Sequence, residues 1–199
     1  GICLHETEAC QMSPNSNSLP TNTNPLLWYA MSATFGRELK VKAILEQEEV
    51  ECFVPMRYEI RKYKGRKTVR QLVSAVSNLI FVHTTRDTLK DIKERIEYLH
   101  FLVQHQDGRN TPIIVSEQQM AQFISVCNTH NEKLRYLSPD EIDLSKGTRV
   151  RIAGGTFDGV EGTFVRVAPG KHKRVFVMVE GVIGVMLTQI SDGYIQVLD

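Results

Sequence analysis

The chain has 199 residues, of which 42% are apolar and 24% are charged, a composition typical of one or two compact globular domains. Its 24 Lys and Arg residues nearly balance its 23 Asp and Glu residues, and the net charge of +1 argues against a polycationic tail protein and an acidic disordered activation domain. Every apolar run is shorter than the roughly 18 residues that a membrane-spanning helix needs, so we expect no membrane contact.

Residues 1–26 predict a flexible leader, because residues 13–25 are rich in Ser, Asn and Pro and poor in apolar side chains. The leader shows neither the basic region nor the apolar run of a signal peptide, so we expect a cytoplasmic protein whose cysteines are reduced. The nearby Cys3, His5 and Cys10 fit the ligand spacing of no common metal site. The sequence also lacks nucleophile-elbow, zinc-protease, Walker and dinucleotide-binding motifs. We therefore expect no enzyme activity, no metal and no other cofactor.

The hydrophobic pattern of residues 27–130 predicts an α+β domain. Apolar or alternating runs predict its strands, at residues 28–33, 52–55, 57–63, 69–73 and 78–83. Apolar residues at helical spacing predict helices at residues 36–49, at residues 89–99 and from Ser116 onward, where Ser-Glu-Gln-Gln fits a capping box. This order of elements predicts an antiparallel sheet with flanking helices.

The remaining residues predict a linker and a second domain. Residues 131–145 are polar and lack a long periodicity, which is typical of a linker. In residues 146–199, short alternating runs separated by Gly-rich turns predict a small SH3-like β-barrel. Its many glycines and Pro169 disfavour a helical form, so we expect a permanent barrel, tethered to the first domain without masking it.

Residues 57–73 predict a hairpin with a cationic tip. The overlapping residues 51–70 hold seven basic and two acidic side chains, a local net charge of +5 that is the strongest electrostatic feature of the chain. The basic residues are Arg57, Arg61, Lys62, Lys64, Arg66, Lys67 and Arg70. Lysines and arginines commonly keep an exposed strand soluble, and the hairpin then needs no ligand. Interleaved with Tyr58 and Tyr63, the same cations also offer phosphate contacts and stacking surfaces to single-stranded nucleic acid.

Residues 79–82 are all apolar, although alternate side chains of a strand point to opposite faces of a sheet. If Ile80 and Val82 face the helices, Leu79 and Phe81 lie on the other face. Antiparallel sheets of small domains commonly have one face without a helical cover, so we expect Leu79 and Phe81 to bind a partner. The alternative is that the leader or the barrel buries them within the fold.

Several of these segments resemble the NusG family of transcription elongation factors. Trp28-Tyr29, Gly36-Arg37-Glu38, Val54-Pro55 and the strand at 79–82 look like its N-terminal domain. Residues 146–167 look like a KOW motif, with Gly155, Phe157, Gly159 and Gly162 in the expected places. The resemblance covers residues 27–198, and within the family the chain is most similar to specialised operon-associated members of the RfaH and UpxY types. Ser77-Asn78-Leu79 departs from the Pro-Gly-Tyr or Pro-Asn-Tyr common in the family, which removes an aromatic anchor.

The resemblance implies a protein that binds the clamp helices of RNA polymerase and suppresses pausing or termination. It places an apolar docking surface at Val76, Leu79, Phe81 and Ile114. Arg37 and Lys40 fall where specialised members touch the non-template DNA strand. The KOW domain implies termination factor Rho or a small-subunit ribosomal protein as a further partner.

Together these features predict a non-enzymatic antiterminator of a particular operon, such as one for polysaccharide biosynthesis. We expect Arg61, Lys62, Lys64, Arg66 and Lys67 to contact the non-template DNA or the nascent RNA. The alternative is a KOW-containing RNA-binding ribosomal or translation protein. That class is expected to concentrate basic residues on the barrel, whereas residues 142–199 hold seven basic and six acidic side chains.

Overall fold

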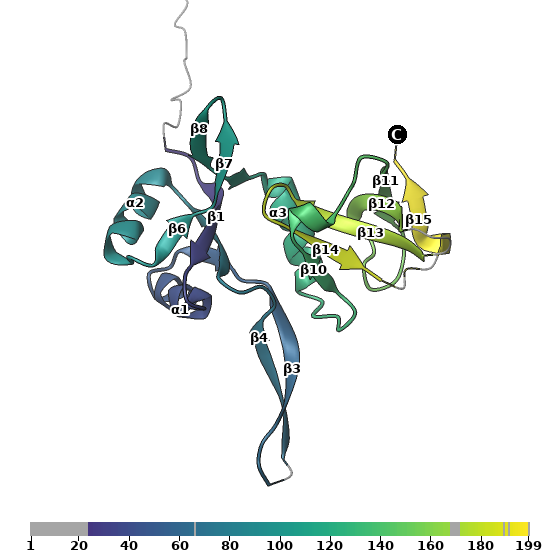
Figure 1. Cartoon of the computed structure of the whole chain (residues 1–199), viewed down its shortest axis with the longest axis horizontal. Coiled ribbons are helices and arrows are strands. Elements are labelled where there is room, and N and C mark those ends of the chain that lie inside the picture. The colour runs from purple at the N-terminus through teal and green to yellow at the C-terminus, as the bar shows by residue number, and fades with distance from the viewer. Residues whose placement is uncertain (1–23, 66, 168–171, 189, 191, 199) are drawn as a thin grey trace, which may run out of the picture.

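The computed structural model describes residues 24–65, 67–167, 172–188, 190 and 192–198 (Figure 1). Residues 1–23 of the predicted leader therefore lie outside the described part. Within that part, the chain forms an N-terminal region of three helices around an antiparallel sheet, followed by a C-terminal β domain. None of the described helices is long and apolar enough to cross a membrane.

The N-terminal region contains the predicted α+β elements, with a short hairpin in addition. The second helix is shorter than expected, because it ends at Arg95 and Leu99 begins a strand. In chain order its elements are β1 (Leu27–Ala33), α1 (Glu38–Gln47), β2 (Glu51–Phe53), β3 (Met56–Lys62), β4 (Thr68–Ser74), β5 (Leu79–Thr84), α2 (Arg86–Arg95), β6 (Leu99–Phe101), β7 (Val103–Gln106), β8 (Arg109–Pro112), β9 (Ile114–Val115) and α3 (Glu117–Cys127). The central sheet has the order β2-β5-β1-β6, and β9 pairs with β1 beside β6. The hairpin β7–β8 leaves the sheet between β6 and β9.

Both faces of the central sheet are covered, which differs from the expectation of one open face. Ile80 and Val82 pack with α1 and α2 as predicted, in a core that also holds Leu45 and Leu89. Leu79 and Phe81 point to the opposite face, where α3 and the C-terminal domain bury them. In Figure 1, α1 and α2 lie on the left of the sheet, and α3 and the C-terminal domain lie on its right.

Local sequence explains where two of the helices begin. The Thr85 side chain caps α2 by accepting a hydrogen bond from the Thr88 amide at 3.3 Å. The Ser116 side chain caps α3 in the same way, accepting from the Gln119 amide at 3.2 Å, which confirms the predicted start of this helix. The buried residues of α3 lie at helical spacing and face the sheet and the C-terminal domain: Met120, Phe123, Val126 and Cys127.

The C-terminal domain is a six-stranded antiparallel sheet of the order β10-β14-β13-β12-β11-β15. Its strands are β10 (Arg135–Leu137), β11 (Thr148–Ile152), β12 (Glu161–Val167), β13 (His172–Val179), β14 (Ile183–Leu187) and β15 (Ile195–Val197), with short 3-10 helices η1 (Pro139–Glu141) and η2 (Asp192–Tyr194). The five strands β11–β15 confirm the predicted β-rich domain. The first strand, β10, was not expected, because it lies in the polar segment predicted as a linker and pairs with β14.

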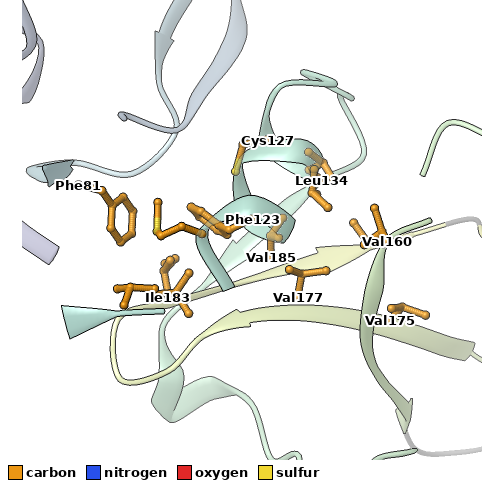
Figure 2. Close-up of a cluster of buried hydrophobic side chains, with 14 of the residues drawn as sticks. Phe81, Phe123, Cys127, Leu134, Val160, Val175, Val177, Ile183 and Val185 are labelled. Carbon is orange, nitrogen blue, oxygen red and sulfur yellow. The ribbon is translucent and has the colours of Figure 1, made fainter. Parts of the chain in front are cut away.

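The C-terminal domain packs against α3. This differs from the expectation of a barrel that is only tethered to the first domain. One continuous core contains Phe81 and Phe123 of the N-terminal region and valines of β13 and β14. Figure 2 shows Phe123 between Phe81 on one side and Val177 and Val185 on the other. The Gln122 side chain also accepts a hydrogen bond from the Glu161 amide at 3.1 Å. The apolar face of α3 is therefore broad enough to pack against both sheets.

Candidate nucleic-acid and protein interfaces

The four residues predicted to dock on a partner differ sharply in exposure. Phe81 is 0% exposed and Leu79 is 5% exposed, and Val76 is partly buried against the same core. Ile114, on the short strand β9, is 50% exposed. Of these four predicted residues, Ile114 is thus the one that presents most of its side chain to a partner in this arrangement.

A hollow of about 400 Å³ lies beside Ile114 at the edge of the central sheet. Apolar side chains form most of its wall, including Tyr29, Phe101 and Pro112. Arg86, at the start of α2, also lines the hollow. An accessible apolar surface of the N-terminal region therefore lies at this edge, whereas the sheet face that carries Phe81 is buried.

The cationic hairpin β3–β4 projects away from the rest of the molecule (Figure 1). Its strands pair from Met56 with Ser74 to Lys62 with Thr68, which confirms the predicted hairpin. Gly65 stands in the turn with a φ of 107°, a conformation that favours glycine. Arg66 lies outside the described residues.

The basic residues of the hairpin fall into two groups. Further from the turn, Arg70 pairs with Ile60, and its guanidinium contacts Glu132 at 3.2 Å and lies 4.0 Å from the centre of the Tyr58 ring. On the neighbouring stretch of β3, Glu59 pairs with Arg61 at 3.1 Å. Within the described part of the chain, no carboxylate pairs with the three lysines nearer the turn: Lys62, Lys64 and Lys67. The outer part of the hairpin therefore carries the cations that are most available to phosphates.

Arg37 and Lys40 meet at one aromatic ring that sequence reasoning missed. The Arg37 guanidinium lies 4.6 Å from the centre of the Tyr98 ring, and the Lys40 ammonium lies 5.6 Å from it. Arg37 also lies 5.6 Å from the centre of the Phe35 ring. The expected placement of the two cations on one helix face is thus correct. Tyr98 comes from the segment just before β6, and its distance from Arg37 and Lys40 in the sequence is why their contact with it was not predicted.

Asn78, the middle residue of Ser77-Asn78-Leu79, has a structural role in the turn before β5. Its φ of 69° lies in the left-handed region, where asparagine is better tolerated than most residues. Its side-chain oxygen accepts from the Gly36 amide at 2.8 Å, and its own amide donates to Glu38 at 3.1 Å. Asn78 therefore holds the turn before α1 against the start of β5.

His83 is a second feature that the sequence did not reveal. Its ring stacks on Trp28, with ring centres 4.6 Å apart and planes 11° apart. Nδ1 lies 2.9 Å from Glu51 and Nε2 lies 2.8 Å from Glu117. The His83 imidazole therefore connects β2, β5 and the first turn of α3, which supports a structural role in holding α3 on the sheet.

Burial also raises the pKa of two cysteine thiols and one tyrosine of the protein. Removal from water raises the pKa of the Cys127 thiol to about 12, and it raises the pKa of the neighbouring Tyr136 as well. Burial raises the pKa of Cys52, on β2, to about 11. Both thiols are protonated at neutral pH, as expected of cysteines that pack and do not react.

The predicted KOW residues have structural roles in the described fold. Gly155 and Gly159 adopt φ values of 73° and 82° in the turn between β11 and β12. A Cβ at Gly162 would lie 2.7 Å from the Phe176 carbonyl oxygen, so the close approach of β12 and β13 requires glycine there. The Phe157 side chain is 8% exposed and packs into the core.

Cys3, His5 and Cys10 lie outside the described residues. Within the described part of the chain, no three His, Cys, Asp or Glu side chains gather in a way that would hold a metal ion.

Comparison with known proteins defines the class to which this fold belongs. A family model described as "Transcription termination factor nusG" matches residues 26–124, which span β1 to most of α3. Through this domain the chain belongs to the NusG family. It is a transcription elongation and antitermination factor, and the proteins of this family are non-enzymatic.

A solved structure described as "Domain interaction in Thermotoga maritima NusG" is also similar to the chain. The two sequences are 17% identical, the match covers 88% of this chain and 98% of that chain, and the TM-score is 0.43. No curated protein matched the sequence. The C-terminal β domain resembles a KOW domain in its small antiparallel sheet and in the glycines of its first turn.

Proposed function

We propose that this protein binds RNA polymerase and suppresses pausing or termination, as a specialised antiterminator for a particular operon such as one for polysaccharide biosynthesis. The NusG domain supports a role in transcription. The observation that carries the finer proposal is the outward-projecting hairpin, whose outer lysines stand clear of carboxylates in the described structure. Such a hairpin can reach nucleic acid beside a protein on which the body of the domain is docked.

The proposed polymerase surface comprises Val76, Leu79, Phe81 and Ile114, with the clamp helices as the partner. Ile114 and the apolar hollow beside it are accessible in the described arrangement. Leu79 and Phe81 lie under α3 and the C-terminal domain, so they contact polymerase directly only if that cover moves away. Docking through Ile114 requires no such movement, and we therefore propose it as the first contact.

The proposed nucleic-acid surface has two parts. Lys62, Lys64 and Lys67 contribute the outer hairpin, together with Arg61 and Arg66. Arg37 and Lys40 form the second part at the start of α1. Arg61 is already paired with Glu59, so we expect its phosphate contact to be weaker than that of the lysines. The strand bound is the non-template DNA or the nascent RNA.

The C-terminal domain has termination factor Rho or a small-subunit ribosomal protein as its proposed partner. Part of its surface packs on α3 in this structure. The alternative of an RNA-binding ribosomal or translation protein receives no support from a NusG domain at residues 26–124.

Co-purification tests the proposed docking surface. The full chain carries Ile114→Asp, which places a charge at the accessible edge, and Val197→Asp serves as a matched control because Val197 is also exposed, at 68%, but lies on β15. RNA polymerase should co-purify with the unmodified chain and with the control, and binding should fall at least about thirtyfold with Ile114→Asp if Ile114 is a central anchor. Equal binding by all three proteins would place the docking surface elsewhere, and no binding by any would refute the proposed polymerase contact.

A further inference from the structure

Phe35 is the most exposed large apolar side chain among the described residues. Its ring is 86% exposed, although it lies in the short turn between β1 and α1. Its φ is 61°, in the left-handed region that non-glycine residues rarely adopt. A strained backbone that presents a large aromatic ring to solvent suggests a functional requirement at this position.

A network of hydrogen bonds holds the turn in this conformation. Asn78 accepts from the Gly36 amide at 2.8 Å through its side chain, and its carbonyl accepts from the Ala33 amide at 2.8 Å. Glu38, which is 5% exposed, accepts from the Asn78 amide at 3.1 Å. The turn is thus fixed on both sides of Phe35, and the ring stands on a rigid support.

Two cations and a second aromatic ring flank Phe35. Arg37 lies close to both rings, 5.6 Å from the centre of Phe35 and 4.6 Å from the centre of Tyr98. Lys40 lies 5.6 Å from the centre of Tyr98 on the same helix turn. The contacts of Arg37 and Lys40 with the Tyr98 ring position their charged groups beside the exposed ring of Phe35.

Single-stranded nucleic acid fits this combination best. An unpaired base stacks on an open aromatic face, and its flanking phosphates pair with neighbouring cations. An apolar protein partner would need only the Phe35 ring, and its binding would remove the charged groups of Arg37 and Lys40 from water at a cost in free energy. A duplex offers phosphates but no unstacked base for Phe35.

We propose that Phe35 is a stacking platform for one unpaired nucleobase, with Arg37 and Lys40 binding the adjacent phosphates. The inference rests on the proposed function, which assigns Arg37 and Lys40 to a nucleic-acid strand, and it adds the residue that contacts the base. Tyr98 acts as a positioning residue for the two cations. The strand can be DNA or RNA, because every base has a face that stacks.

Binding of labelled oligonucleotides to the full chain tests the platform. The probes are oligothymidylate and oligouridylate of about ten nucleotides, close to the length that single-strand binders cover, and a DNA duplex. Phe35→Ala and Phe35→Leu should each weaken single-strand binding by about 5- to 100-fold, since each loses the aromatic face. Phe35→Trp should retain the affinity, and base stacking should quench the fluorescence of the new indole. Duplex binding should change less than twofold in all variants.

Control variants separate stacking from charge and from folding. Val197→Ala, which also alters an exposed apolar side chain, should bind like the unmodified protein. Arg37→Gln should flatten the dependence of affinity on salt, whereas Phe35→Ala should leave that slope unchanged. Because Phe35 is exposed, its variants should melt within a few degrees of the unmodified protein.

Two results would overturn the platform. One is that Phe35→Ala and Phe35→Leu bind both single strands as tightly as the unmodified protein. The other is that the unmodified protein binds neither strand. In both cases the proposed function is judged separately, by polymerase co-purification with the same preparations. A preference for thymidylate or uridylate identifies the strand as DNA or RNA, and either preference supports the platform when Phe35→Ala removes it.

Discussion

The Phe81 ring on β5 meets the Phe123 ring on α3 edge-on, with ring centres 5.7 Å apart and planes 62° apart. Phe123 also lies 6.2 Å from Phe53 on β2 and 6.5 Å from Tyr136 on β10, again measured between ring centres. One aromatic side chain of α3 thus contacts strands of both sheets. The two halves of the chain are therefore coupled through α3.

Substitution should show that Phe81 belongs to the core and that Ile114 belongs to the surface. Phe81→Ala should lower the free energy of unfolding by about 3–5 kcal/mol, because it leaves a cavity beneath Phe123. Ile114→Ala should change it by less than about 1 kcal/mol, since half of that side chain is already in water. Urea denaturation followed by circular dichroism measures both, and a near-native Phe81→Ala would contradict the buried position.

Neutral substitution of the outer hairpin lysines should reduce the salt dependence of nucleic-acid binding. If Lys62, Lys64 and Lys67 each contact a phosphate, replacing all three with Gln should flatten the slope of log K against log salt by about 2 for a single strand. Arg57→Gln is the matched control, because Arg57 lies on the same hairpin with Glu59 at 4.0 Å. An unchanged slope in the triple variant would show that these lysines are solvated and contact no phosphate.

The protein should lose stability in alkaline solution. The pKa of Cys127 is raised to about 12 in the folded state, whereas an unfolded cysteine titrates near about 8.5. A raised pKa contributes stability that is fully present below the unfolded value and is lost as pH rises toward the folded value. The urea midpoint should therefore be steady from about pH 7 to 8.5 and fall above it. Cys127→Ala should show a shallower fall, and a midpoint that does not decrease up to about pH 10.5 would contradict the burial of this thiol.

Gly162 should tolerate no side chain. A Cβ there would lie 2.7 Å from the Phe176 carbonyl oxygen and 2.9 Å from Val175 Cγ1, so Gly162→Ala should destabilise the C-terminal domain by about 1–3 kcal/mol. Gly193→Ala is the control, because nothing lies within 4 Å of the added Cβ. Thermal melting of both variants measures the difference, and equal melting temperatures would argue against the tight approach of β12 and β13.

Local sequence signals predicted the elements well, and relations between distant residues were the part they could not supply. The Ser116 cap, the hairpin turn at Gly65 and the alternation of Ile80 and Val82 are local patterns, and the structure confirms each of them. The strand β10 looked like a linker because its three residues acquire their pairing only from β14, about 50 residues away.

The sites show the same division. The spacing of Arg37 and Lys40 on one helix face is visible in the sequence, but Tyr98 reaches them from another part of the fold. The exposure of Phe35 depends on a left-handed turn that Asn78 fixes from 42 residues away. The burial of Phe81 depends on α3 and the C-terminal domain together, so the sequence left its cover as one of two open alternatives.

Single-round transcription by purified RNA polymerase tests the central proposal most directly. The template carries a pause site and a terminator, and the full chain is compared with Ile114→Asp and with Val197→Asp. The account predicts that the unmodified protein and Val197→Asp shorten the pause and increase read-through, and that Ile114→Asp abolishes both effects. Longer pauses, more termination or no change with the unmodified protein would contradict it.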